Sequence, residues 1–413
     1  MAAYSKSSQL DDIQLLLERI AKNDKSGFTQ LFCQLKDVNF VDVTGMSLLA
    51  CASFKGNKEA VQILLACLSN TTLFPQQGAD VHLNQHGTDY TPLHFAALSG
   101  STDVCRQLLD AGINPSSINS VSRTASQMAA FVGNHACVET INNYITRSGL
   151  EYYTQAHGQQ TEPLIPPALL SAFHTFVIEI NLHPVRIALN AQSLGLLRIL
   201  SNLRKTLALM CEKEMQKTHD MNELLAFKFH YQGWIVAELI RCEEQFKAQH
   251  KEKTGGGEPE VNKNDFIELF VKRVLKENKQ GQLDYVEYTL RECAREFPVR
   301  ECTIFRQIAT QFGGKDAPPA LVILRNAING MRGFVDETSY CSTCGQEKPD
   351  KKCSKCKAVQ YCDRECQRLH WFMHKKSCAR LLAASLAGAT TQVQSKGPID
   401  TSELQEQLSK LSA

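Results

Sequence analysis

The sequence predicts a mainly α-helical protein of several domains: an amino-terminal solenoid of helical repeats, a helical middle region and a carboxy-terminal finger that holds two zinc ions. Three observations predict this fold class. A ten-residue phrase recurs within the first 150 residues, apolar residues recur at helical spacing through the middle, and eight Cys and His donors lie within residues 341–378. A chain of 413 residues is long enough for two to four domains.

The repeated phrase is clearest at Thr91–Gly100, which reads TPLHFAALSG. Thr124–Gly133 follows 33 residues later, and Ser47–Gly56 precedes it by 44 residues, one period plus eleven. We assign the excess to an insertion at Leu68–Gly78, which is rich in turn-forming residues. The phrase and its period resemble those of the ankyrin repeat. Residues 1–150 are therefore predicted to form an ankyrin-repeat array of about four repeats, the first of them degenerate.

Each phrase is expected to begin a short inner helix that is capped by its Thr or Ser. His94 lies three residues after Thr91, so we interpret it as a hydrogen-bonding residue that stabilises the turn and not as a catalytic base. Ankyrin arrays usually hold partners on a concave face lined by loops, and a folded partner is expected there. The residues of one such loop are His82, Gln85, His86 and Asp89.

Residues 151–335 are predicted to be helical, with a fold that the sequence does not identify. A glycine-rich break is expected near residues 254–260. The Gly313–Gly314 turn does not fit a phosphate-binding loop, because no glycine precedes it at the required spacing. Helices are expected at Ala168–Ile180, Arg186–Lys213, Asn222–Gln249, Asp265–Glu277, Asp284–Arg295 and Cys302–Phe312.

The finger, residues 336–385, is predicted from the order C-x2-C, C-x2-C, C-x3-C and H-x3-C between Cys341 and Cys378. Each C-x2-C pair can present two thiolates to one tetrahedral ion, and eight N and S donors make two closed four-ligand sites. Closed sites are structural and not catalytic. A module this small buries little apolar surface, so metal binding is expected to supply most of its folding free energy. The tail, residues 386–413, is predicted to be disordered.

The run Tyr361-Cys362-x3-Cys366, followed by His374-x3-Cys378, resembles the MYND zinc-finger family, whose two zinc ions take alternate ligand pairs along the chain. The family pattern favours His374 over the nearby donor His370. The resemblance implies one Zn²⁺ held by Cys341, Cys344, Cys362 and Cys366, and a second held by Cys353, Cys356, His374 and Cys378.

MYND fingers recognise short proline-rich peptides of the P-x-L-x-P type, and Gln367 and Trp371 occupy the positions that contribute to that groove. A Trp face stacks well on proline rings, and an extended proline-rich peptide loses little entropy on binding. Alternatively, Trp371 only fills the small core of the finger. The chain's own Pro163–Pro167 (PLIPP) approximates the motif and could bind in cis, but we favour a stiff connector that begins the helix at Ala168.

Composition restricts the compartment and the partners. The 45 Lys and Arg against 43 Asp and Glu leave no global attraction to nucleic acid or to a membrane. The ten basic and four acidic residues within Cys341–Arg380 partly offset the negative charge of the two metal sites, so nucleic-acid binding is not expected. No apolar run approaches a membrane span, and the first residues lack a signal core. We expect a cytoplasmic protein, with the nucleus less favoured.

The order of ankyrin repeats, helical middle and MYND finger resembles the ankyrin repeat and MYND domain-containing proteins. This resemblance implies a non-enzymatic adaptor whose ankyrin face and finger bind different partners, with a role in delivering signalling proteins to the cilium. One alternative is a nuclear co-repressor that uses the same peptide groove, although no basic localisation run supports it. The other is a protein-modifying enzyme, because MYND fingers also occur in SET-domain methyltransferases, but the N-H-S-C motif of those enzymes is absent.

Overall fold

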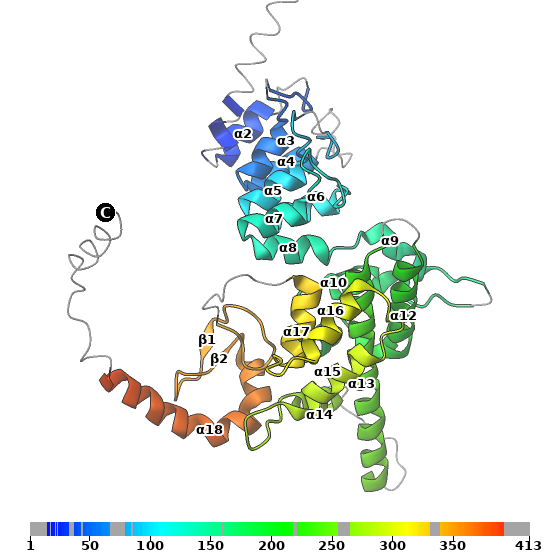
Figure 1. The fold of residues 1–413 in the computed structure, drawn as a ribbon, viewed down its shortest axis with the longest axis vertical. Coiled ribbons are helices and arrows are strands. Elements are labelled where there is room, and N and C mark those ends of the chain that lie inside the picture. Colours follow the sequence, from blue (N-terminus) through cyan, green and yellow to red (C-terminus); the bar gives the residue numbers. More distant parts are fainter. Residues whose placement is uncertain are drawn as a thin grey trace, which may run out of the picture.

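The structure is a computed structural model that describes residues 15–16, 18–20, 22, 24–32, 37–42, 44–66, 79–83, 86–158, 161–217, 221–254, 265–330 and 339–391. Helices dominate it, and the described residues contain one two-stranded sheet, so the mainly α-helical fold class is confirmed. The chain forms three regions in sequence order (Figure 1): the repeat array before Arg147, the helical region Arg147–Asn329, and the finger from residue 339 onward.

The repeat array stacks helix pairs one on the next. Its inner helices begin where the repeated phrases predict, because Ser47, Thr91 and Thr124 each accept a hydrogen bond from the backbone N–H three residues later. The predicted insertion at 68–78 and the loop residue Gln85 lie outside the described residues. The helices are α2 (Lys25–Phe32), α3 (Leu48–Phe54), α4 (Lys58–Ala66), α5 (Pro92–Ser99), α6 (Thr102–Asp110), α7 (Ala125–Val132) and α8 (His135–Asn142).

His94 has the structural role that the sequence predicts. Its side chain is fully buried, Nδ1 accepts from the Thr91 N–H at 3.2 Å, and Nε2 donates to the carbonyl of Arg123 at 3.0 Å. Both ring nitrogens are therefore occupied by backbone groups of adjacent repeats. Burial lowers the pKa of His94, which favours the neutral ring that these two bonds require.

The helical region is built around α13 (Glu223–Thr254), the longest helix described, which packs on α12 (Leu200–Gln216), α14 (Asp265–Val274) and α11 (Pro184–Ser193). Its other elements are α9 (Arg147–Glu151), η1 (Tyr152–Thr154), η2 (Pro167–Leu169), α10 (Leu170–Val177), η3 (Leu196–Ile199), α15 (Asp284–Arg295), α16 (Thr303–Phe312) and α17 (Ala320–Asn329).

One helix prediction in this region was wrong, and one helix was not predicted. The single helix expected at Arg186–Lys213 is divided, because α11 ends at Ser193 and Gly195 adopts a left-handed φ of 71° before η3. Helix α17 was not predicted, although Ile323, Leu324 and Ile328 follow Pro319 at helical spacing and are all buried.

The finger consists of a short hairpin and one helix. Strand β1 (Lys351–Lys352) pairs antiparallel with β2 (Gln360–Tyr361), and α18 (Arg364–Thr391) follows. Helix α18 extends through residues 386–391, into the segment predicted to be disordered, because the Leu- and Ala-rich sequence after Cys378 propagates a helix readily. Residues 392–413 lie outside the described part of the chain.

The finger packs directly on the helical region, and one core of buried apolar residues runs through both. The Asn181 side chain donates to the carbonyl of Cys344 at 3.1 Å, and Arg368 of α18 forms an ion pair with Glu268 of α14 at 2.8 Å. The repeat array is joined to the helical region by a buried hydrogen bond from Asn143 to Asn329 at 3.0 Å. None of the described helices is long and apolar enough to span a bilayer.

Candidate functional site

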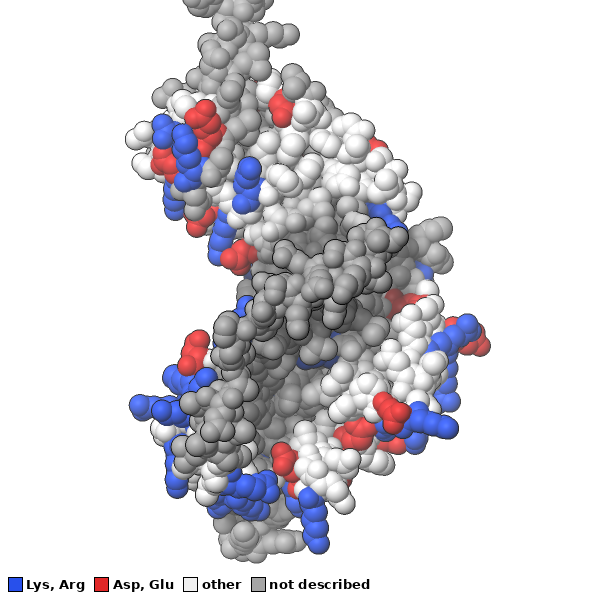
Figure 2. All heavy atoms as spheres, turned by 60° about the vertical axis from the view of Figure 1, so that its left-hand side comes forward, with Lys and Arg blue, Asp and Glu red and all other residues white. Residues whose placement is uncertain are grey.

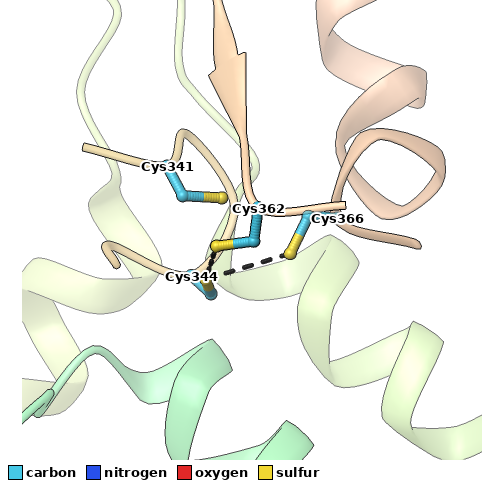
Figure 3. Close-up of side chains that lie close together, drawn as sticks. All are labelled: Cys341, Cys344, Cys362 and Cys366. Carbon is cyan, nitrogen blue, oxygen red and sulfur yellow. Dashed lines mark hydrogen bonds between the residues drawn. The ribbon is translucent and has the colours of Figure 1, made fainter. Parts of the chain in front are cut away.

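The first candidate metal site joins two turns and the start of α18. Cys341 and Cys344 lie on one turn, Cys362 directly follows β2, and Cys366 lies in the first turn of α18. Figure 3 shows the four side chains converging on one region, and the four sulfur atoms lie within 4.8 Å of one another. The Sγ of Cys344 is 3.5 Å from that of Cys362 and 3.8 Å from that of Cys366. A tetrahedral zinc site with Zn–S bonds of about 2.3 Å places its sulfurs about 3.8 Å apart.

The second site contains three thiols and one imidazole, from Cys353, Cys356, His374 and Cys378, all of them buried. The Sγ atoms of Cys353 and Cys378 are 4.0 Å apart, and Nε2 of His374 lies 3.6 Å from Sγ of Cys356. These spacings also suit a tetrahedral ion. The prediction of two zinc ions per chain is therefore confirmed by the fit of both donor sets.

Local structure positions these donors. Gly345, with φ of 66°, and Lys357, with φ of 56°, reverse the chain directly after each C-x2-C pair. The Asp363 carboxylate accepts from the backbone N–H of Cys366 at 2.7 Å and so caps α18. The Thr343 hydroxyl, buried between the first turn and α18, donates to the carbonyl of Cys366 at 2.6 Å.

In each cluster the hydrogen bonds favour deprotonation of one thiol, whereas neighbouring thiols and burial raise the pKa of Cys344, Cys362, Cys366 and Cys378. Hydrogen bonds from the thiols of Cys344 and Cys366 lower the pKa of Cys341 far below its usual value. For Cys353, burial opposes ionisation, but the backbone N–H of Cys356 and further hydrogen bonds outweigh it and lower the pKa to about 6. Thiolates are the form in which cysteine binds a metal.

The competing donor His370 lies outside both clusters. The Tyr361 hydroxyl lies 3.1 Å from Nδ1 of His370, and burial lowers the pKa of this ring to about 4. The choice of His374 over His370 made on family pattern agrees with this arrangement.

The two residues proposed for peptide binding lie on one face of α18, four positions apart. The Trp371 side chain is 45% exposed, and its ring centre lies 5.9 Å from that of His374. Gln367 is half-buried. Such exposure disfavours the alternative that Trp371 only fills the core of the finger.

The run Pro163–Pro167 is already packed in the helical region. Ile165 is fully buried, and its backbone N–H donates to the carbonyl of Tyr153 at 3.1 Å. Pro167 begins η2, as expected of a connector. Binding of this segment to the finger would require Ile165 to leave the core of the helical region. The arrangement therefore favours the role of Pro163–Pro167 as a stiff connector.

The sequence did not predict that Lys228 is buried. Lys228 of α13 has no exposed surface, and its Nζ has no hydrogen-bond partner among the residues that the structure describes. Burial lowers the pKa of this ammonium to about 7, which the nearby Glu179 only partly opposes. A lysine within an apolar helical pattern predicts a surface position. Only the packing of other helices around α13 shows that Lys228 is buried.

Comparison with known proteins agrees with this organisation. A family model described as ankyrin repeats, in three copies, matches residues 1–119 and 65–146, and one described as MYND finger matches residues 341–378. Dauer abnormal formation protein 25 of Caenorhabditis elegans is 29% identical over 407 residues, which cover 96% of this chain and 97% of that protein.

Two other relatives match over short segments only. The SET domain and MYND-type zinc finger protein 6 of Schizosaccharomyces pombe is 39% identical over 78 residues, 18% of this chain and 16% of that protein. The zinc finger MYND domain-containing protein 10 homolog of Drosophila melanogaster is 45% identical over 51 residues, 12% of this chain and 11% of that protein.

Proposed function

Since this chain is an ankyrin-repeat protein with a C-terminal MYND finger, we propose that it is a non-enzymatic adaptor whose two modules bind different partners. The observation that carries the proposal is the closed donor set of each metal cluster beside an exposed tryptophan. Four protein ligands leave a zinc ion no open position for a substrate, whereas Trp371 offers an aromatic surface to solvent.

The repeat array supports the first half of this proposal through its exposed apolar residues. Phe54 of α3, Leu98 of α5 and Phe131 of α7 each occupy the eighth position of a repeated phrase, so they follow one face of the stacked inner helices. Phe54 is 48% and Phe131 is 85% exposed, and Leu98 is half-buried. Val121, in the loop before α7, is 61% exposed. An apolar row of this kind suits a folded protein partner.

At the finger, the proposed ligand is a proline-rich peptide of the P-x-L-x-P type. A proline ring would stack on Trp371, and the Gln367 amide would bond the backbone of the extended peptide. A contact surface this small suits an affinity of roughly micromolar strength.

For the cellular role we propose delivery of signalling proteins to the cilium by a cytoplasmic adaptor. Its support is the resemblance of the domain order to the ankyrin repeat and MYND domain-containing proteins. Imaging of the tagged chain at endogenous level tests it. Signal in the cytoplasm, and loss of ciliary cargo when the chain is depleted, is the expected result, whereas nuclear residence would favour the co-repressor.

The adaptor proposal is tested by quantitative pull-down from cells with three single-site variants. Phe131→Ser changes the repeat face, Trp371→Ala changes the finger, and Tyr288→Ser is the matched control, because Tyr288 of α15 is 68% exposed and lies in neither module. We expect one set of partners to fall at least about tenfold with Phe131→Ser only, and another with Trp371→Ala only. If neither change removes a partner, the helical region carries the interactions and the proposal is wrong.

Peptide binding at the finger is tested by calorimetry with a synthetic P-x-L-x-P peptide and the intact chain. Trp371→Ala is expected to weaken binding about thirtyfold, because loss of a central aromatic contact costs about 2 kcal/mol. Zinc content and circular dichroism should stay unchanged, since Trp371 is not a ligand. Equal affinity of the variant and the wild type would exclude peptide binding at Trp371.

A further inference from the structure

The basic residues of the finger gather around the second metal cluster. Strand β1 contributes two lysines directly before Cys353, the turn at Cys356 carries two more, and the remaining three lie beside His374 and Cys378 on α18. In Figure 2, blue side chains outnumber red ones at the lower left of the face shown. The seven exposed basic residues are Lys351, Lys352, Lys355, Lys357, Lys375, Lys376 and Arg380.

The basic excess of the finger is divided unevenly between the two metal sites. Among the described residues 341–380, the sequence beside the second set of ligands contains Asp350 as its one acidic residue against seven basic ones, while the cluster with Zn²⁺, three thiolates and a neutral imidazole would carry one negative charge. Around the first cluster the charges balance, because Lys348, Arg364 and Arg368 accompany Glu347, Asp363 and Glu365. The finger is therefore strongly cationic at one end only.

The exposed tryptophan lies at the boundary of this cationic end. Its ring contacts His374 of the second cluster, and His374 lies 3.6 Å from Cys356, which Lys355 and Lys357 flank. Lys375 follows Trp371 by four residues on α18 and so lies one helical turn along the same face.

On the other side of Trp371 the charge is already neutralised. Arg368 precedes Trp371 by three residues, and its guanidinium pairs with Glu268 and Glu365, both at 2.8 Å. Lys272 also pairs with Glu268 at 2.8 Å. A ligand on Trp371 therefore meets paired charges toward α14 and, toward the second cluster, lysines that form no ion pair with any described residue.

We propose that the ligand of the finger is an acidic proline-rich peptide, whose proline segment lies on Trp371 and whose Asp or Glu residues lie against Lys375, Lys376 and the lysines of the Cys356 turn. This inference rests on the proposed peptide-binding function and names the chemistry of its partner. An anionic membrane fits the surface less well. Trp371 is the one exposed large apolar side chain among the described residues 341–383, and an interfacial helix needs a broader apolar face.

The test uses the full-length zinc-loaded chain and three peptides that share one P-x-L-x-P core and differ in a flank of three Glu, three Gln or three Lys. The Glu peptide is expected to bind about five- to tenfold more tightly than the Gln peptide at low salt, and the difference should largely vanish at about 0.5 M salt. Lys375→Glu/Lys376→Glu should abolish the advantage of the Glu peptide, preserve the affinity for the Gln peptide and strengthen binding of the Lys peptide. Lys279→Glu, an exposed charge reversal outside the finger, is the matched control.

The outcomes separate this inference from the function on which it rests. Equal binding of the Glu and Gln peptides, both lost in Trp371→Ala, would overturn the acidic preference and leave peptide recognition intact. Failure of all three peptides to bind would overturn both. Binding to phosphatidylserine vesicles or to RNA that falls in the double variant, with no difference between the Glu and Gln peptides, would assign the cationic end to another ligand and overturn the inference. Metal analysis of the double variant checks that both zinc ions are retained.

Discussion

Chelation of zinc is expected to unfold the finger and to loosen the part of the helical region on which it packs. Each site is expected to contribute on the order of 10 kcal/mol to folding, more than the small apolar core of the finger can replace. The turn at Cys341–Gly345 packs on the segment before α11, through the Asn181 bond to Cys344 and the contact of Gly345 with His183, where a Cβ would lie 3.1 Å from the ring. Unfolding of this turn should therefore also destabilise the adjacent part of the helical region.

Metal analysis combined with hydrogen exchange tests this expectation. The intact chain should contain two zinc ions, and chelation should increase amide exchange in the finger and around residues 180–184, while α5 to α8 of the repeat array stay protected. Cys353→Ala should remove the second ion. Cys51→Ala, a half-buried cysteine of α3 outside both clusters, is the matched control and should retain both. One ion or none in the wild type, or unchanged exchange after chelation, would contradict the two-site finger.

Replacement of the buried Lys228 by Met is expected to stabilise the helical region by on the order of 4 kcal/mol at pH 7. Lys228 is fully buried and its Nζ has no hydrogen-bond partner among the described residues. Burial lowers its pKa from 10.5 to about 7, so the unfolded chain binds this proton more tightly than the folded one. Methionine has a similar length and needs no partner in an apolar core.

The sign of the pH dependence follows from that difference. Between pH 7 and about 10 the unfolded state keeps the Lys228 proton and the folded state does not, so the contribution of this group to the free energy of unfolding rises with pH. The advantage of Lys228→Met should therefore be largest at pH 7 and below, and should shrink toward pH 10. Comparing the variant with the wild type at each pH cancels the contributions of other titrating groups.

Urea unfolding at pH 7 and at pH 9.5 measures this effect. A background of Trp371→Phe leaves Trp234 of α13 as the single tryptophan probe, because the chain has two. Lys247→Met is the matched control on the same helix, since Lys247 is exposed and should change stability by less than about 0.5 kcal/mol. A Lys228→Met protein that is less stable than the wild type at pH 7 would show that the buried ammonium has a favourable partner.

Local chemistry explains why the metal ligands and the repeats could be predicted. A C-x2-C turn brings two thiols together over four residues, and His374 and Cys378 lie one helical turn apart, so spacing alone indicates shared ions. The ankyrin phrase likewise encodes a cap and a short helix within ten residues, which Thr91 and Thr124 form as expected. The pairing of the two ligand sets came from family resemblance and agrees with the clusters.

The features of the helical region that the sequence did not predict have a different physical cause. The break at Gly195 separates two stretches with nearly continuous apolar spacing, so periodicity suggested one helix where a left-handed residue ends it. The burial of Lys228 depends on helices that pack on α13 from distant parts of the chain. The surroundings of that lysine therefore cannot be read from neighbouring residues.

By itself, the sequence determined the two zinc sites, the repeat array and the helical character of the middle, because each depends on residues that lie close together in the chain. Only the tertiary structure decided that the finger shares a core with the helical region, that Trp371 stays exposed, and that Arg368 is neutralised by Glu268. The shared core and the Arg368 ion pair join residues about 100 or more positions apart, through shape and charge complementarity between whole elements, and no local pattern encodes that complementarity.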